Sequence, residues 1–176
     1  MTAREDVRLR PAVPGDELAV ARIHVRAWQV GYRGLLPDGY LGGLRAEDRA
    51  ARYTFARTDP GRPQTIVAVR GDAVLGFATT GPAGGAGGAG ELLALHVEPD
   101  RWRGGVGRAL IAAARDRLVA GGFAEAVLWL LDGNERAARF YEADGWAFDG
   151  TDRTDEVWGI TVRERRYRRV LTPPVE

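Results

Sequence analysis

Apolar and polar residues alternate in short runs at the start of the chain. Residues Val7 to Arg10 alternate as in a short strand, and Asp16 follows at a position where its side chain would cap a helix. Apolar side chains then recur at steps of three and four residues, which predicts a helix that ends near Gly31 and Gly34. The apolar face of this helix comprises Leu18, Ala21, Val25, Trp28 and Tyr32.

The next segments predict a second helix and a hairpin. The second helix is expected over Ala46 to Arg57. Two β-type runs, 65–69 and 74–78, flank Gly71-Asp72, and this combination predicts an antiparallel hairpin with a tight turn. Residues Gly81 to Gly90 are almost all glycine and alanine, which favours a flexible loop between neighbouring strands.

The second half of the chain changes to alternating strands and helices. We expect strand Leu92 to Val97, helix Val106 to Ala120, strand Ala126 to Leu131, helix Glu135 to Ala143, and strand-like runs Trp146 to Phe148 and Thr161 to Val170. A strand, helix, strand order produces parallel neighbours, so the chain should form an α/β fold with a mixed sheet. We expect a single domain over residues 1–171, followed by a short tail over 172–176 that begins Thr172-Pro173-Pro174.

The composition excludes several kinds of chemistry. The 176 residues include no cysteine and no lysine, and only His24 and His96 carry imidazoles. Thiol nucleophiles, lysine Schiff bases and a metal site are therefore not expected. The formal charge of +1 gives little attraction to nucleic acid, and no segment combines the length and apolarity of a membrane span. We expect a cytoplasmic protein whose partners are small molecules, without nucleic acid or membrane binding.

A glycine-rich turn precedes the helix at Val106. It reads Pro-Asp-Arg-Trp-Arg-Gly-Gly-Val-Gly-Arg-Ala-Leu over residues 99–110. Glycines let consecutive backbone N–H groups point at one oxyanion, and the free amides at a helix start favour negative charge, although such turns also occur for steric reasons alone. The P-loop pattern fails because no lysine follows the glycines, and the dinucleotide fingerprint fails at Leu110.

The segment from Leu92 to Leu110 resembles the acyl-coenzyme A signature of the GNAT superfamily, in which Gln/Arg-x-x-Gly-x-Gly/Ala opens a helix. Gly105 and Gly107 stand at the two glycine positions, and Trp102 departs from the usual Gln or Arg. The resemblance implies that one run of the turn and helix start binds the coenzyme A pyrophosphate. That run comprises Arg103, Gly104, Gly105, Val106, Gly107, Arg108 and Ala109.

A second segment, residues 134–146, resembles the superfamily pattern Asn-x-x-Ala-x-x-Phe-Tyr-x-x-x-Gly-Phe. By that resemblance Asn134 and Ala137 contact the pantetheine arm, and the Tyr141 hydroxyl faces the thioester sulfur. A neutral tyrosine can protonate a departing thiolate, so Tyr141 is the expected general acid. The same residues also suit a purely structural interpretation, with Asn134 as a helix N-cap and Tyr141 as a core aromatic.

The strand before the turn supplies further candidates. Glu91 matches a position where many relatives carry an acidic residue, and it is the candidate base that deprotonates the amine; an ordinary charged strand end is the alternative. Backbone amides near Leu95 and Val97 would polarise the thioester carbonyl if the strand acts as in relatives. His96 occupies the family's aromatic position in the coenzyme-binding strand, where we interpret it as lining the wall.

The acceptor side is less defined. Residues 27–41 resemble the same region in small bacterial members of the superfamily, some of which act on polyamines or other small amines. That resemblance makes Trp28, Tyr32 and Asp38 candidate substrate-binding residues, while packing of Trp28 and Tyr32 on the sheet is an equally good interpretation.

The resemblance as a whole implies a fold and an activity. The expected fold is a mixed sheet of six to seven strands flanked by about four helices, and the expected activity is N-acetyl transfer from acetyl-CoA to a primary amine by direct attack. The acceptor stays open among small amines or polyamines, amino acids, antibiotics and protein N-termini. The alternative function is a catalytically silent sensor that binds acyl-CoA. Nucleic-acid binding through the arginines at 163–169 is a third hypothesis with less support, because a strand would divide these side chains between two faces. A homodimer that pairs through the final strand is also open.

Overall fold

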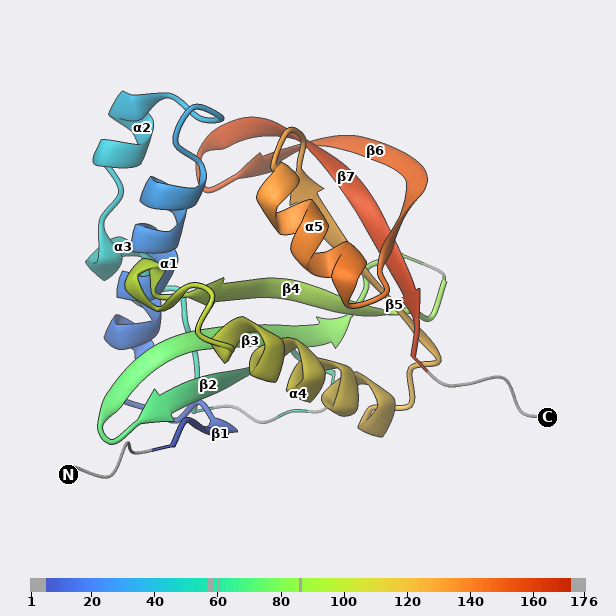
Figure 1. Cartoon of the computed structure of the whole chain (residues 1–176), viewed down its shortest axis with the longest axis horizontal. Helices are drawn as coiled ribbons and strands as arrows, with labels where there is room; N and C mark the ends of the chain where they lie inside the picture. Colours follow the sequence, from blue (N-terminus) through green and yellow to red (C-terminus); the bar gives the residue numbers. More distant parts are fainter. Residues whose placement is uncertain (1–5, 57–58, 60, 86, 172–176) are drawn as a thin grey trace.

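The computed structural model describes residues 6–56, 59, 61–85 and 87–171. Within them a sheet of seven strands has the order β1-β2-β3-β4-β5-β7-β6 (Figure 1). The strands are β1 (Arg8–Pro11), β2 (Gln64–Arg70), β3 (Ala73–Pro82), β4 (Gly90–Val97), β5 (Glu125–Leu131), β6 (Ala147–Val157) and β7 (Ile160–Val170). The helices are α1 (Glu17–Gly31), α2 (Asp38–Gly42), α3 (Ala46–Ala50), the 3-10 turn η1 (Pro99–Arg101), α4 (Val106–Ala120) and α5 (Glu135–Ala143). The predicted α/β fold with a mixed sheet is confirmed.

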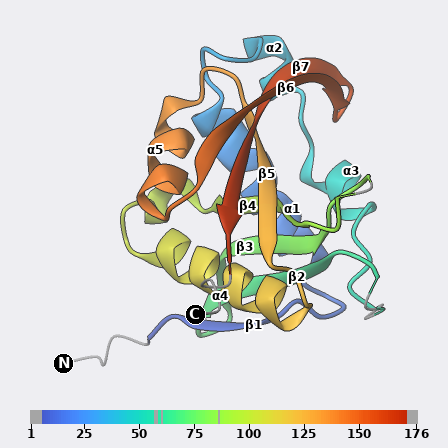
Figure 2. The same cartoon turned by 90° about the vertical axis from the view of Figure 1, so that its right-hand side faces the viewer.

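Alternation along the central strands divides the apolar residues between two faces. Ile66 and Ala68 of β2 pack in the larger core with Leu110 of α4, whereas Val67 packs on the opposite face with Val20 of α1. Successive side chains of a strand point to opposite faces, so one sheet separates two layers of helices. Figure 2 shows α5 and α3 on opposite sides of β5.

The sheet opens between β4 and β5. These two strands are parallel, and their described ladder consists of Gly90 with Ala126 and Glu91 with Val127. The register of β4 against β3 shifts beside this point, where Leu93 lies between the paired residues Leu92 and Ala94. A bulge bends a strand and increases its twist. Beyond Glu91, β4 therefore diverges from β5 and leaves one edge of its backbone beside a cavity.

Two local predictions at the N-terminal half were wrong. Asp16 stands at the start of α1, but its side chain makes no capping bond; it accepts bonds from Arg10 at 2.7 Å and 3.0 Å and from the Val13 amide at 2.8 Å. The charge-assisted pair with Arg10 satisfies the carboxylate instead. The helix predicted to reach Arg57 ends at Ala50, and Arg57 itself lies outside the described residues.

Strand β6 also differs from its prediction. The apolar run Trp146 to Phe148 marks only its start, and the strand continues to Val157 through the polar residues 149–156. Of these residues, 152–156 pair with β7 after a register shift, on the edge of the sheet where polar side chains need no apolar partner. The predicted tail over 172–176 lies outside the described residues.

The arginines of β7 are committed to ion pairs. Each of the five has a carboxylate partner: Arg163 and Arg165 with Asp152 (both 3.5 Å), Arg166 with Asp149 (2.6 Å), Arg168 with Glu125 (2.5 Å) and Arg169 with Asp144 (2.9 Å). Binding to a nucleic-acid backbone depends on cationic side chains that are free to neutralise phosphates and so displace their counterions. The pairing therefore argues against a nucleic-acid surface on this strand.

None of the helices in the described part of the chain is long and apolar enough to span a membrane.

Candidate active site

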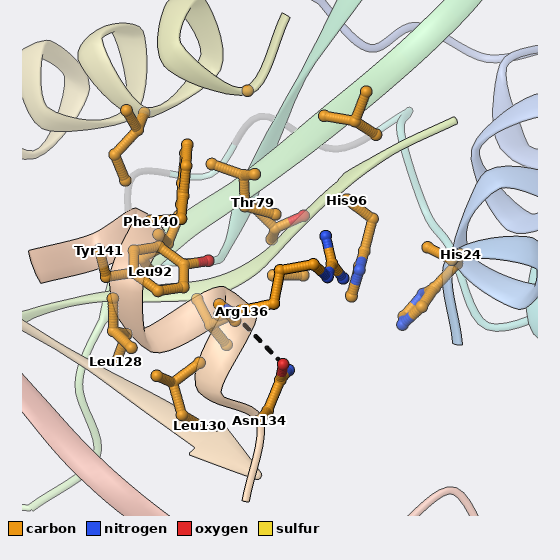
Figure 3. A pocket seen from close by; sticks show the side chains of 18 of the residues that line it. His24, Thr79, Leu92, His96, Leu128, Leu130, Asn134, Arg136, Phe140 and Tyr141 are labelled. Carbon is orange, nitrogen blue, oxygen red and sulfur yellow. Dashed lines mark hydrogen bonds between the residues drawn. The ribbon is translucent and has the colours of Figure 1, made fainter. Parts of the chain in front are cut away.

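A cavity of about 1340 Å³ occupies the opening between β4 and β5 (Figure 3). It is continuous from the start of α4, past the N-terminal half of α5, to the inner side of α1. Among the predicted site residues, those that line it are Trp28, Tyr32, Leu95, His96, Val97, Arg103, Gly105, Gly107, Arg108, Asn134, Ala137 and Tyr141. The two ends of this cavity differ in construction, and we name them the turn end, at the start of α4, and the aromatic end, beside α1.

The turn end is shaped by the glycines that open α4. Gly105 has φ of +89°, a left-handed conformation that side chains with a β-carbon disfavour. A Cβ on Gly107 would lie 3.4 Å from the ring of Phe140 in α5, so glycine lets the two helices approach closely here. Helix geometry leaves the first amides of α4, from Val106 to Arg108, without a carbonyl partner inside the helix. These amides and the helix dipole favour a bound anion.

Arginine side chains surround the same end. Arg101, Arg103 and Arg108 line the cavity, and Arg103 also has a positive φ of 64°. A concentration of guanidinium groups beside free amides is an arrangement that phosphate groups bind well. Gly104, Val106 and Ala109 do not line the cavity themselves. The Gly104 and Ala109 amides already donate to the carbonyls of Arg101 and Gly105, at 3.2 Å and 3.0 Å, so of these three residues Val106 alone offers a free backbone amide.

Trp102 contacts two residues, Val97 and Arg136, and the contact with Arg136 was not evident from the sequence. Its Nε1–H donates to the Val97 carbonyl at 2.9 Å, and the guanidinium of Arg136 stacks on its ring at 3.7 Å. Arg136 comes from α5 and lines the middle of the cavity. A guanidinium thus lies close to the signature position that Trp102 occupies, held by a cation–π contact.

Helix α5 carries the two residues of the second motif. Asn134 caps the helix through Oδ1, which accepts the Ala137 amide at 3.3 Å, so the predicted structural role is confirmed. The cap uses only the oxygen and leaves the side-chain N–H₂ as the group that can donate to a ligand. Tyr141 is 7% exposed, and its hydroxyl points toward the space beside Arg136 (Figure 3). Burial raises the pKa of the Tyr141 phenol, which keeps it protonated at neutral pH.

The C-terminal end of α5 is fixed by Asp144. Its carboxylate accepts from Arg115 of α4 at 3.0 Å and 3.1 Å, from Arg169 of β7 at 2.9 Å, and from the Trp146 indole at 3.0 Å. Arg169 also donates to the Asp144 carbonyl. Charge-assisted bonds in such a network are stronger than isolated neutral ones. The network joins α4, α5 and β7 and so holds Tyr141 in place.

The aromatic end begins with two stacked histidines. His24 of α1 and His96 of β4 have ring centroids 4.7 Å apart, and His24 Nδ1 is hydrogen bonded to the Tyr53 hydroxyl at 2.7 Å. Burial lowers the pKa of both imidazoles, that of His96 to about 4, and the positive charge of Arg49 acts in the same direction. Both rings are therefore neutral at neutral pH. A base this weak cannot deprotonate an alkylammonium group, which supports the interpretation of His96 as a wall residue.

Trp158 closes this end from the β6–β7 hairpin. Its ring lies 4.8 Å from Trp28 and 5.0 Å from His24, and its carbonyl accepts the Tyr40 hydroxyl of α2 at 2.7 Å. The Arg49 guanidinium of α3 lies over the same ring at 4.8 Å. Four separate segments, from α1, α2, α3 and the hairpin, thus meet at one wall.

Of the other predicted site residues, Tyr32 lines the cavity, whereas Glu91 and Asp38 lie outside its lining. Tyr32 lines it beside Trp28, and burial raises the pKa of its phenol to about 12. Glu91 is outside the lining, although burial raises the pKa of its carboxyl and it interacts with Trp129 and Glu164, which do line the cavity. Asp38 is the exposed first residue of α2 and lies outside the cavity, so we do not retain it as an acceptor contact.

The cavity also contains residues that the sequence reasoning did not single out. They are Arg49, Tyr53, Arg136 and Trp158, together with His24, which was noted only in a count. Trp158 was detectable, because it precedes Gly159 between two runs that alternate, a pattern typical of a hairpin turn. The others lie on elements that give no local signal of where their side chains point. Among the described residues, no group of three or more potential metal ligands occurs.

Comparisons with known proteins agree with this geometry. The curated protein YuaI of Bacillus subtilis, described as an uncharacterized N-acetyltransferase, is 32% identical over 122 residues, which span 64% of this chain and 65% of the relative's length. Among solved structures, PaiA N-acetyltransferase of Thermoplasma acidophilum in complex with coenzyme A has a TM-score of 0.70 at 16% identity, covering 91% of this chain and 98% of that one.

Two further structures share the fold. The yncA protein of Salmonella typhimurium with its cofactor acetyl-CoA has a TM-score of 0.70 at 19% identity, covering 97% and 96% of the two chains. The ribosomal-protein-S18-alanine N-acetyltransferase of Escherichia coli has a TM-score of 0.68 at 20% identity, covering 97% of both. The sequence model of the Acetyltransferase (GNAT) family matches residues 28–146. The chain therefore belongs to the acetyltransferase (GNAT) family.

Proposed function

We propose that this protein transfers an acetyl group from acetyl-CoA to a primary amine by direct attack in a ternary complex. The observation that carries the proposal is the single cavity that joins a phosphate-type cradle at the start of α4 to the buried Tyr141 hydroxyl and then to the aromatic end. Both substrates would enter the same cavity from its two ends. Family membership and the coenzyme A and acetyl-CoA complexes of similar structures support the same activity.

The turn end fits coenzyme A. Its pyrophosphate would rest on the amides at the start of α4 with Arg103 and Arg108 beside it, and the pantetheine arm would run along the open edge of β4. Unpaired backbone groups of a strand edge can bind an extended amide-containing chain. The Asn134 side-chain N–H₂ would donate to that arm while Oδ1 continues to cap α5.

The chemical step needs one proton removed and one delivered. The neutral amine attacks the thioester carbon, the nitrogen loses a proton as the amide forms, and the carbon–sulfur bond breaks to release the thiolate. Tyr141 donates its hydroxyl proton to the sulfur and is reprotonated from solvent. Burial keeps the phenol in its protonated form, as this role requires. From the neutral amine, the products are the N-acetyl amine and the coenzyme A thiol with no net proton; counted from the ammonium form, one proton is also released.

Removal of the amine proton is assigned to Glu91 acting through water. An alkylammonium group has a pKa of about 10.4, so attack at neutral pH requires an acceptor for its proton. Glu91 lies outside the cavity lining, but it interacts with Trp129 and Glu164, which line the cavity. Burial raises the pKa of the Glu91 carboxyl, which makes it a better base than an exposed glutamate.

Replacing Tyr141 with Phe tests this assignment. The substitution removes the hydroxyl proton and keeps the ring, so we expect kcat to fall by about 100-fold or more while the acetyl-CoA Kd stays within about twofold. Tyr167→Phe is the matched control, because Tyr167 is an equally buried tyrosine that does not line the cavity. Equal kcat in the two variants would remove Tyr141 from the mechanism. If the wild-type protein binds acetyl-CoA but transfers the acetyl group to no amine, the sensor alternative is favoured.

A further inference from the structure

The charges at the aromatic end are unbalanced. Two guanidinium groups, Arg49 and Arg136, line the cavity close enough to lower the pKa of His96. The carboxylates that line the cavity within the described residues are Asp144 and Glu164, and both are already paired. Asp144 binds Arg115 and Arg169, and Glu164 binds Arg153 at 2.9 Å. No carboxylate in this described lining is left to neutralise the two guanidinium groups.

Unpaired donors occur at the same place. Among the described residues, the buried side-chain N–H groups without a hydrogen-bond partner are Arg49 Nε and Trp28 Nε1. Trp28 is 7% exposed, and both residues line the cavity. A buried donor left unpaired destabilises the protein, and a ligand that supplies an acceptor atom can recover this cost. Both orphaned groups are donors, so the complementary ligand atom is an acceptor such as an oxyanion.

The turn that closes this end is strained. Trp158 and Gly159 both have positive φ, 53° and 78°, as in a two-residue type I′ hairpin turn. Asn, Asp or Gly normally fills the first of these positions, and a bulky residue there is conformationally strained. The strain is retained at a residue whose ring contacts Trp28 and lies under Arg49. Such retention favours a role for the ring at the binding site.

We propose that the amine acceptor carries an oxyanion, a carboxylate or a phosphonate, which Arg49 and Trp28 bind at the aromatic end under the ring of Trp158. The inference rests on the proposed transfer activity and names its substrate class as amino-acid-like amines. A polyamine, which carries only positive charge, would place a cation among Arg49 and Arg136. Like charges in a partly buried site repel, so this class is disfavoured.

The test compares amines that differ only in the carboxylate. Calorimetry on protein saturated with coenzyme A, which cannot transfer an acetyl group, gives the Kd of L-lysine against cadaverine, L-ornithine against putrescine, and L-phenylalanine against 2-phenylethylamine. We expect the acid to bind at least about tenfold more tightly in one or more pairs, as a charge-assisted bond predicts. A further arm compares 1-aminoethylphosphonate with alanine and ethylamine, which distinguishes the two oxyanions.

Arg49→Gln should reduce the preference in the responding pair to within about twofold, because it removes the charged guanidinium and keeps a polar side chain. Arg52→Gln is the matched control, one turn further along, exposed and outside the cavity lining, and should keep the preference. The inference is overturned if no acid binds better than its decarboxylated partner, or if Arg49→Gln leaves the ratio unchanged. Coenzyme A affinity, measured on the same samples, reports separately on the proposed function, since its loss would refute the transfer activity itself.

Discussion

The two ends of the cavity are built in opposite ways. The turn end comes from a continuous segment, residues 101–108, with Asn134 and Ala137 from one further helix. The aromatic end combines side chains from separate elements or turns, including His24 of α1, Arg49 of α3, His96 of β4 and Trp158 of the β6–β7 turn. The first relies mainly on backbone groups and the second on side chains. A site made of backbone in a short segment has a local sequence pattern, whereas a site made of distant side chains does not.

The same difference separates the chemistry of the two ends. On the proposed assignment, backbone amides beside a positive-φ glycine would bind a group that is common to every coenzyme A molecule, so their geometry would tolerate few changes. The aromatic end would select one amine among many through ring stacking and charge. We therefore expect substitutions at the turn end to abolish coenzyme binding, and substitutions at the aromatic end to change acceptor affinity alone.

The largest expected effect is at the glycines. Replacing Gly105 with Val and Gly107 with Leu should weaken acetyl-CoA binding by at least about 100-fold, which corresponds to about 2.7 kcal/mol. The first change disfavours the left-handed backbone, and the second adds side-chain atoms beyond a Cβ that would itself already be in contact with Phe140 at 3.4 Å. Calorimetric titration of acetyl-CoA measures the loss.

A matched control is available at the other end of α4. Gly122 has φ of +88° with no atom within 4 Å of an added Cβ, so Gly122→Val carries the same backbone strain without touching the cavity. We expect Gly122→Val to lower thermal stability and leave the acetyl-CoA Kd unchanged, while Gly105→Val alone weakens binding. If both single variants bind normally, the cradle assignment is wrong.

Trp158 should give an intermediate effect confined to the acceptor. Trp158→Asn keeps a residue that suits positive φ, so the hairpin turn and the Tyr40 bond to its backbone carbonyl should persist. Loss of the ring should raise the KM for the amine by about tenfold, in the range of one desolvated cation–π or aromatic contact. The acetyl-CoA Kd should change by less than about twofold. A parallel loss of coenzyme binding would show that the two ends are not independent.

The remaining effect is on stability rather than on binding, and it comes through His96. Its folded pKa of about 4 lies below the unfolded value of about 6.5, so the unfolded chain binds the proton first as pH falls. The contribution of His96 is complete above pH ~6.5 and is lost toward pH ~4, by at most about 3 kcal/mol. His24 from α1 acts in the same direction, while Arg49 and Arg136 supply the positive charges that face the ring.

Chemical denaturation of wild type and His96→Phe between pH 7.5 and 4.5 measures this contribution. The variant should lose less of its free energy of unfolding over that range, because phenylalanine takes up no proton. The carboxylates Asp16 and Asp149, whose pKa values are lowered by Arg10 and Arg166, lose their contributions only below this window. Superimposable profiles for the two proteins would mean that His96 is not held neutral by its surroundings.

The sequence predicted most of the fold and the turn end because both depend on local patterns. Alternation identified the strands, and the order strand, helix, strand predicted the parallel pair. The glycines of the turn and Asn134 were identified through their resemblance to two motifs of the GNAT superfamily. The bounds predicted for strand β6 and helix α3 were wrong. Both elements contain many polar residues, and their ends depend on pairing at the sheet edge and on tertiary packing rather than on a local pattern. Arg136 was missed because its stacking on Trp102 joins residues 34 positions apart, and no local pattern encodes such a contact.

The measurement that tests the central claim most directly combines two readings on the wild-type protein. Acetyl-CoA is titrated by calorimetry, and release of free coenzyme A thiol is then followed against amino acids, polyamines, aminoglycosides and N-terminal peptides. The account predicts saturable binding and stoichiometric thiol release with at least one amine, fastest with an amine that carries an oxyanion. Absence of acetyl-CoA binding would contradict it outright.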